Sequence, residues 1–271
     1  MIPTYLYHYT SLETLLLILE ENTIRFSRLD LMNDPVEGHN DIWPECRENV
    51  FSSSWTAEAR DELPMWKLYS DLKGVRIRMP IDLFNFSDKL EASKREGLFL
   101  IKSKLSKPAI IERYNFDKIN NVGPMKFKDS ESVYGPTAVT YHENKEAISE
   151  GMVVPEDYGE DRYQINLTLI GGRKLDYWSF EKEYRYRIIY GDALRIYGNL
   201  GYLKQFSEGN GIIQRHLDVE FKQESLEGVE IILGPHSNSS DRNKIVEILR
   251  SKNITSFSVL KSKLEIKPIL N

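Results

Sequence analysis

The segment Trp178–Arg187 carries acidic and basic side chains at a spacing that could do chemistry. Drawn as a strand, in which alternate residues face the same side, it places four of them on one face: Glu181, Glu183, Arg185 and Arg187. Two carboxylates one strand step apart can grip a polyhydroxy ligand or divide acid and base roles between them. Two structural alternatives fit the same spacing: an exposed charge ladder on a sheet, and a helix in which Glu181 pairs with Arg185.

A row of hydroxyl groups is the second candidate. Three consecutive serines lie in the segment Phe51–Thr56, between large aromatic residues, although serine is not a favoured strand residue. As a strand, the segment aligns the hydroxyls of Ser52, Ser54 and Thr56 on one face. Short hydroxyls in a row can hold a carboxylate or a sugar hydroxyl. A serine-rich loop is the alternative.

His8 is a candidate ligand-binding residue near the start of the chain. It lies in the aromatic segment Tyr5–Tyr9, whose composition favours a strand, and faces opposite to its tyrosine neighbours. A lone histidine on a strand is more often structural, so both roles stay open. Thr10 follows as the first residue of a predicted capping box with Glu13, which would start a helix.

An aromatic helix supplies a third candidate surface. The segment Pro64–Tyr69 is predicted to be a short helix, with proline in its first turn. Its aromatic side chains, Trp66 and Tyr69, are typical of core packing. They could instead form the floor of a pocket for a planar ring.

The segment Asn33–Glu37 is acidic and contains Asn-Asp-Pro. This pattern indicates an Asx turn before proline. Asp34 and Glu37 also offer two carboxylates to a metal ion. The histidines of the chain are dispersed without the spacing of metal ligands, so the turn is the favoured interpretation.

Length and composition limit the classes of protein that the chain can belong to. It has 271 residues, a net charge of −5 and an ordinary share of hydrophobic residues, 41%, which is typical of a globular domain and argues against a nucleic-acid coat protein. Its single cysteine, Cys46, excludes a disulfide framework and a multi-cysteine zinc site. The longest apolar run, Leu15–Leu19, is too short to span a membrane and lacks the flanks of a signal peptide. A cytoplasmic protein without membrane association is expected.

Hydrophobic periodicity predicts one mixed α+β domain over residues 1–271, with partly antiparallel strands. Val75, Ile77 and Met79 alternate with arginines, the pattern of a half-buried strand. Regular strand–helix–strand repetition is absent, which argues against a Rossmann fold or a TIM barrel. The Lys- and Glu-rich residues 85–130 are interpreted as a helical insertion.

Four motifs resemble those of a bacterial family of unknown function. Its members carry a Tyr-(Lys/His)-Tyr-x-Ser opening, Asn-Asp-Pro-x-Glu, Met-Trp-x-x-Tyr followed by Gly, and Trp-x-x-Glu-x-Glu-Tyr-Arg. In this chain they are Tyr7–Ser11, Asn33–Glu37, Met65–Tyr69 with Gly74, and Trp178–Arg185. The resemblance spans most of the chain and implies no activity by itself.

At a greater distance, the same landmarks resemble the ADP-ribosyltransferase superfamily. This resemblance implies a mostly antiparallel split sheet, with His8 on the strand that holds NAD and Ser52–Ser54 on the hydroxyl-bearing strand. Glu183 would be the catalytic glutamate, and Glu181 the accessory glutamate that polarises an acceptor. No metal is implied.

The chemistry that the resemblance implies is cleavage of the nicotinamide–ribose bond. Glu183 would bind the ribose 2′-hydroxyl and stabilise charge at the anomeric carbon, as in glycoside hydrolysis. Tyr9 would stack on nicotinamide, and Arg185 or Arg187 would neutralise the pyrophosphate. The residues expected to bind NAD are His8, Tyr9, Thr10, Ser52, Ser54, Trp66, Tyr69, Arg185 and Arg187.

Three function classes therefore stay open. The first is an ADP-ribosyltransferase-like enzyme or NAD glycohydrolase, a class that includes toxins and phage-defence effectors; its acceptor could be a protein, a nucleic acid, a small molecule or water. The second is a non-catalytic binding or regulatory module, in which the charged strand would form a solvated ladder. The third is a metal-dependent nuclease or phosphodiesterase using Asp34, Glu37, Glu181 and Glu183, which a chelator would inactivate.

Overall fold

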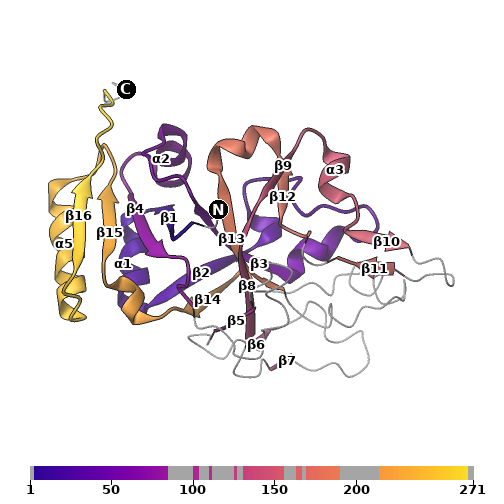
Figure 1. Ribbon diagram of the computed structural model, residues 1–271, viewed down its shortest axis with the longest axis horizontal. Coiled ribbons are helices and arrows are strands. Elements are labelled where there is room, and N and C mark those ends of the chain that lie inside the picture. The colour runs from indigo at the N-terminus through magenta and orange to yellow at the C-terminus, as the bar shows by residue number, and fades with distance from the viewer. Residues whose placement is uncertain are drawn as a thin grey trace.

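The computed structural model describes residues 3–84, 100–103, 110–111, 125–126, 131–155, 163–166, 169–189 and 214–267. They form a mixed α/β structure built on a ten-stranded sheet with few helices (Figure 1). The strands of this sheet are β1 (Tyr5–Thr10), β2 (Thr23–Arg28), β3 (Val50–Thr56), β4 (Val75–Pro80), β5 (Leu100–Ser103), β8 (Glu131–Ala138), β13 (Glu183–Ile189), β14 (His216–Glu220), β15 (Val229–Leu233) and β16 (Phe257–Lys261). Their order is β16-β15-β4-β1-β3-β13-β8-β5, and β2 and β14 form a branch from β3. Every described pairing within this sheet is antiparallel except that of β15 with β16, which confirms the predicted mixed, mostly antiparallel sheet.

The remaining elements are short. The helices are α1 (Leu12–Glu21), α2 (Leu63–Ser70), α3 (Lys145–Ser149) and α5 (Ser239–Ser251). Three two-stranded pairs join β6 (Ile110–Ile111) to β7 (Met125–Lys126), β9 (Thr140–His142) to β12 (Arg173–Leu175), and β10 (Val153–Pro155) to β11 (Tyr163–Ile165). Within the predicted helical insertion 85–130, the described stretches are the strands β5, β6 and β7, and the rest of the insertion lies outside the described residues.

The sheet divides at β3. Strand β13 pairs with β3 along its whole length, from Val50 to Thr56. Because a strand has only two edges, β1 and β2 must share the other edge of β3. Strand β1 pairs there at Thr56, and β2 pairs at Ser52 and Phe51. The two strands therefore separate between these points and leave a fork in the sheet.

Helix α1 joins the two arms of this fork, and its ends are set by local chemistry. The side chain of Ser11 accepts a hydrogen bond from the backbone N–H of Thr14, so Ser11 is the N-cap. The prediction that Thr10 caps the helix is wrong by one residue, because Thr10 is still paired in β1. Asn22 ends the helix in the left-handed conformation, which asparagine tolerates.

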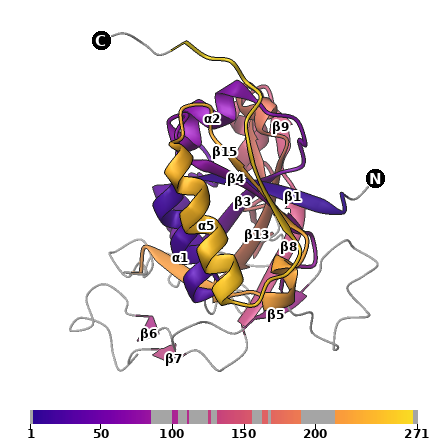
Figure 2. The same ribbon diagram turned by 90° about the vertical axis from the view of Figure 1, so that its left-hand side faces the viewer.

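The helices α1 and α5 lie side by side against the sheet (Figure 2). Their apolar faces, including Leu15, Leu19, Ile245 and Leu249, join the main hydrophobic core with side chains from the sheet. Burying such side chains supplies most of the favourable free energy of folding. Two smaller apolar clusters lie around Trp43 and around Trp66.

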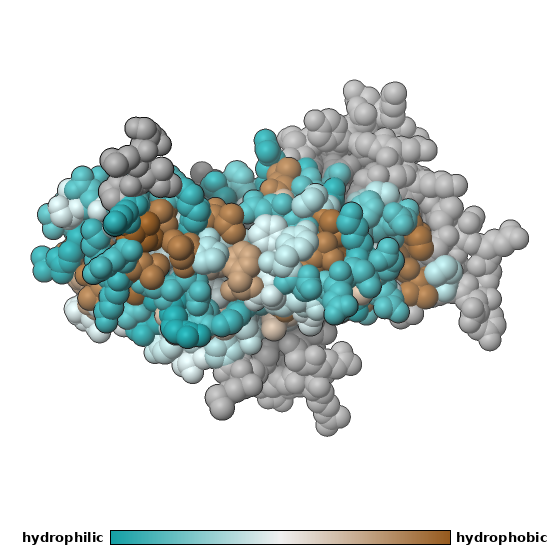
Figure 3. Space-filling view, turned by 90° about the horizontal axis from the view of Figure 1, so that it is seen from above, coloured by the Kyte–Doolittle hydropathy of each residue, from teal (hydrophilic) through white to brown (hydrophobic). Residues whose placement is uncertain are grey.

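The face of the molecule seen in Figure 3 is mainly hydrophilic among the described residues. Leu63 and Leu68 on α2 and Tyr177 are exposed large apolar side chains. On the face seen in Figure 3, the apolar groups of the described residues are separated by hydrophilic ones, as expected of scattered surface residues. No helix in the described part of the chain is long and apolar enough to cross a bilayer.

Candidate functional site

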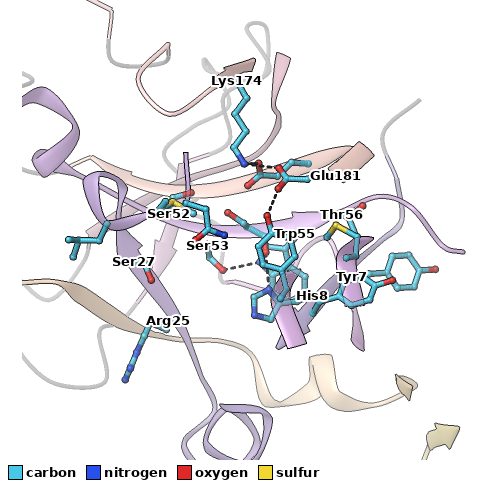
Figure 4. A pocket seen from close by; sticks show the side chains of 18 residues that line it. Tyr7, His8, Arg25, Ser27, Ser52, Ser53, Trp55, Thr56, Lys174 and Glu181 are labelled. Atoms are coloured by element: carbon cyan, nitrogen blue, oxygen red, sulfur yellow. Dashed lines mark hydrogen bonds and ion pairs between the residues drawn. The ribbon is translucent and has the colours of Figure 1, made fainter. Parts of the chain in front are cut away.

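A pocket of about 270 Å³ opens at the fork where β1 and β2 leave β3 (Figure 4). Eighteen residues line it. They are Tyr7, His8, Tyr9, Arg25, Ser27, Leu31, Met32, Asn33, Ser52, Ser53, Ser54, Trp55, Thr56, Met65, Tyr69, Lys174, Glu181 and Glu183. The fork thus brings side chains from both arms of the sheet, from α2 and from the start of β13 to one cavity.

At the fork, the side chain of His8 binds the backbone of β3 at a point where no strand pairs with that edge. Its Nδ1 lies 2.8 Å from the carbonyl oxygen of Ser54, on the edge of β3 that neither β1 nor β2 covers there. Because a carbonyl only accepts, Nδ1 must carry the proton. Burial lowers the pKa of His8, so the ring is neutral at pH 7 and its Nε2 is an acceptor. The ring also lies 5.1 Å from that of Trp55, centroid to centroid.

The hydroxyl row on β3 is present in the predicted strand, and the serine-rich loop alternative is wrong. Ser52, Ser53, Ser54 and Thr56 all line the pocket. The Ser53 hydroxyl accepts a hydrogen bond from the indole of Trp55 at 3.0 Å, which fixes that ring. The Ser54 hydroxyl is buried in the pocket wall and lies near enough to Glu183 to help lower the pKa of that carboxyl.

Two glutamates share one lysine at the floor of the pocket. Lys174 Nζ lies 2.6 Å from Glu181 Oε2 and 2.9 Å from Glu183 Oε2. The hydroxyl of Tyr69 donates to Glu181 Oε1. In Figure 4 the side chain of Lys174 reaches Glu181 from above.

The backbone brings the two glutamates together in a way that differs from the predicted strand. Glu181 is the last residue of the 3₁₀ helix Asp176–Glu181, and β13 begins only at Glu183. Lys182 between them is left-handed, with a φ of 44°. This turn directs both carboxylates to Lys174, so the paired carboxylates are confirmed although the continuous strand is not.

Arg185 fixes Glu183 from behind the pocket. Its guanidinium donates to Glu183 Oε1 at 2.5 Å and to Glu37 Oε2 at 2.9 Å, and it also binds the carbonyl of Gly171 at 3.0 Å. Its side chain is 0% exposed. The exposed charge ladder and the helical pairing are therefore both wrong, because Glu183, Arg185 and Arg187 are buried and lie on a strand.

The charges set the protonation of this cluster. Burial alone would raise the pKa of Glu183, but Arg185 and Lys174 lower it to about 2, so Glu183 is ionised at pH 7. Burial, and then the negative charge of Glu183, raise the pKa of Glu181. Burial opposes the charge of Lys174, yet the surrounding carboxylates raise its pKa. The two glutamates therefore differ in proton affinity, as acid and base pairs do.

Several predicted site residues lie outside the lining. Of the NAD-binding set, the pocket includes His8, Tyr9, Ser52, Ser54 and Tyr69. Thr10, Trp66, Arg185 and Arg187 do not line it. Trp66 is buried in a cluster with Tyr9, as the core-packing alternative predicts, and Arg187 donates to the carbonyl of Ile170 at 2.7 Å.

Other lining residues were missed. Lys174 lies in a short strand whose sequence has no recognisable motif, so no local signal could have found it. Arg25 and Ser27 are on the polar side of the alternating segment Thr23–Arg28, a weak signal. Arg25 is bound in turn by Asp218 on β14, at 2.8 Å and 3.1 Å.

The acidic turn is built as an Asx turn. Asp34 Oδ1 accepts a hydrogen bond from the backbone N–H of Val36 at 2.9 Å. Glu37 is bound by Arg185. Within the described ranges, no group of three or more His, Cys, Asp or Glu side chains is placed to hold a metal ion.

Comparisons with protein-family models, with curated proteins and with solved structures give no significant match to this chain. The functional interpretation therefore depends on the geometry of the site and on the motifs.

Proposed function

We propose that this chain binds NAD in the fork pocket and cleaves its nicotinamide–ribose bond, as an ADP-ribosyltransferase-like enzyme. One observation carries the proposal: Glu183 is a buried carboxylate held ionised by Arg185 and Lys174 at the floor of a pocket lined by hydroxyls and aromatic rings. The fork in the sheet and the order of the motifs along the chain support it.

The charge of the floor suits this reaction. Breaking the bond between nicotinamide and ribose builds positive charge at the anomeric carbon, as in glycoside hydrolysis. Burial raises the pKa of Glu37 and of Glu181, whereas Arg185 and Lys174 keep Glu183 ionised, so Glu183 supplies the negative charge at the floor. A fixed negative charge that needs no rearrangement stabilises such a transition state.

The side chains that line the pocket match the chemical groups of NAD. The rings of Tyr7, Tyr9 and Trp55 provide apolar surface for nicotinamide, and the serine hydroxyls provide partners for ribose. Arg25 is the arginine among the lining residues, so the contact with a phosphate that was expected of Arg185 or Arg187 falls to the part of its guanidinium that Asp218 does not bind. The volume is close to the lower end of ligand pockets, about 300 Å³, so the cavity takes the nicotinamide riboside half of NAD.

Calorimetric titration with NAD in buffer containing a chelator tests binding. Saturable binding is expected, and His8→Ala and Ser54→Ala should weaken it, because both side chains line the cavity. No binding at millimolar NAD would contradict the proposal. Binding without bond cleavage would favour the non-catalytic module.

Release of free nicotinamide tests catalysis. Glu183→Gln should abolish release while NAD still binds, because glutamine keeps the shape and loses the charge. Glu247→Gln is the matched control, since Glu247 is exposed on α5 and does not line the pocket. Unchanged turnover in Glu183→Gln would remove the central residue of the proposal.

A further inference from the structure

We infer that Tyr141 on β9 is a positioning residue for the proposed reaction, because it holds the backbone of Glu183 from outside the pocket. This inference rests on the proposed function and adds to it a residue that lies in none of the four motifs. It follows from how the peptide group between Lys182 and Glu183 is bound.

This peptide group is bound on both of its polar sides. The carbonyl oxygen of Lys182 accepts a hydrogen bond from the backbone N–H of Ala57 at 3.2 Å. The N–H of Glu183 donates to the hydroxyl of Tyr141 at 2.9 Å. Together the two bonds fix the peptide plane at the left-handed turn that precedes β13. Because a peptide unit is planar and moves as one body, its orientation sets the direction in which the Glu183 side chain leaves the backbone.

The same pair of short strands also holds the other end of Glu183. Strands β9 and β12 are parallel, and Tyr141 is paired in register with Lys174. Residues in register on neighbouring strands project to the same face, so this pair presents both side chains to Glu183. Lys174 binds the carboxylate at 2.9 Å, and Tyr141 binds the backbone N–H. Glu183 is therefore held at its tip by a cation and at its base by a hydroxyl.

Tyr141 has the properties of a residue that acts by position alone. Burial raises the pKa of its hydroxyl, so the group is neutral at pH 7 and adds no charge to the site. A neutral hydroxyl can accept a hydrogen bond from an N–H. Tyr141 does not line the pocket, so its loss removes no contact with NAD.

Loss of this hydroxyl leaves the peptide group bound on one side only. A displacement of a reacting group by about 1 Å can cost roughly 100-fold in rate. Lys174 and Arg185 still bind the carboxylate, which limits the displacement. We therefore expect kcat to fall by roughly 10-fold to 100-fold, with the affinity for NAD retained.

The experiment measures nicotinamide release from NAD by the purified full chain and by Tyr141→Phe. The variant should lose kcat as stated and keep KM, and calorimetric titration should give the wild-type affinity and stoichiometry for NAD. The stoichiometry counts folded binding sites, so an unchanged value excludes a loss of rate through unfolding. Tyr177→Phe is the matched control and should keep full activity, since Tyr177 is 59% exposed and does not line the pocket.

A double-variant cycle tests whether Tyr141 acts through Glu183. Glu183→Asp keeps the charge and shortens the side chain, so the carboxylate is already out of place. Adding Tyr141→Phe to Glu183→Asp should then cost little more, because the effects of residues that act as a unit are not additive. Equal losses in the two backgrounds would mean that Tyr141 acts independently of Glu183, and would overturn the inference.

The outcomes separate the inference from the proposed function. Full kcat in Tyr141→Phe, or a fall in NAD affinity or stoichiometry that accompanies the fall in kcat, would overturn the positioning role and leave bond cleavage by Glu183 intact. The absence of nicotinamide release by the wild type would overturn the proposed function itself, and the inference with it.

Discussion

The buried ion pairs of Arg185 provide the sharpest test of how the site is held together. Arg185→Gln removes the cation that bridges Glu37 and Glu183. Glu183 keeps its ion pair with Lys174, but Glu37 is left buried without its ion-pair partner. Removing one partner of a buried ion pair destabilises a protein by about 3–5 kcal/mol, because the remaining charge stays buried. Against a total stability of about 5–15 kcal/mol, this is a large share.

Arg25→Gln is the matched control. Arg25 also binds a carboxylate with two hydrogen bonds, to Asp218 at 2.8 Å and 3.1 Å, but the two side chains are 52% and 31% exposed. Exposed pairs of this kind contribute about 0–1 kcal/mol. Both arginines make bidentate contacts with a carboxylate, but Arg185 is buried and bridges two carboxylates, whereas Arg25 is exposed and binds one.

The assay is equilibrium unfolding in urea, followed by tryptophan fluorescence. The free energy of unfolding should fall by about 3–5 kcal/mol for Arg185→Gln and by less than about 1 kcal/mol for Arg25→Gln. If Arg185→Gln does not fold, the double variant Glu37→Gln/Arg185→Gln should recover folded protein, because it also removes the buried carboxylate that has lost its cation. Equal losses for Arg185→Gln and Arg25→Gln, or no recovery in the double variant, would refute the reasoning.

Three further measurements test other parts of the structure. Glu183 has a folded pKa of about 2 against a reference of 4.5, so its stabilisation is present above about pH 4.5 and is lost as the pH falls toward 2. The advantage of the wild type over Glu183→Gln in urea unfolding should therefore shrink over that interval, by up to about 3 kcal/mol, and a constant difference would contradict the low pKa. His8→Phe keeps a ring but leaves the Ser54 carbonyl without its donor, which should lower the free energy of unfolding by about 1–3 kcal/mol; an unchanged value would mean that water replaces His8. Ser11→Ala should lower it by about 1 kcal/mol through loss of the α1 cap, whereas a loss confined to Thr10→Val would restore the original capping assignment.

Local sequence patterns predicted the elements that carry the site. Aromatic and alternating side chains predicted β1, β3 and β4 within a residue or so, because burial on one side of a strand imposes a period of two. The motifs also selected His8, Ser54, Glu181 and Glu183, which the fold brings to one pocket. These predictions needed only short-range regularities.

Two predictions of local structure were wrong, each at a point where two local patterns compete. The capping box at Thr10 and the true cap at Ser11 differ by one residue, and pairing of Thr10 in β1 decides between them. The segment around Lys182 was predicted as a continuous strand, but a left-handed residue divides it into a 3₁₀ helix and β13. Tertiary contacts decided the position of the helix cap and the break at Lys182, because the local propensities of the competing conformations differ by too little.

Only the tertiary structure decided which side of the charged strand is buried and what neutralises it. Periodicity places Glu183 and Arg185 on one face, but an exposed ladder has the same period as a buried network. Glu37, 148 positions away from Arg185, and Lys174, on a strand with no recognisable motif, complete that network. Their positions follow from the sheet dividing at β3, a long-range arrangement that no local window of sequence contains. The amino-acid sequence by itself thus identified candidate residues, and the tertiary structure decided which of them lie in the same pocket.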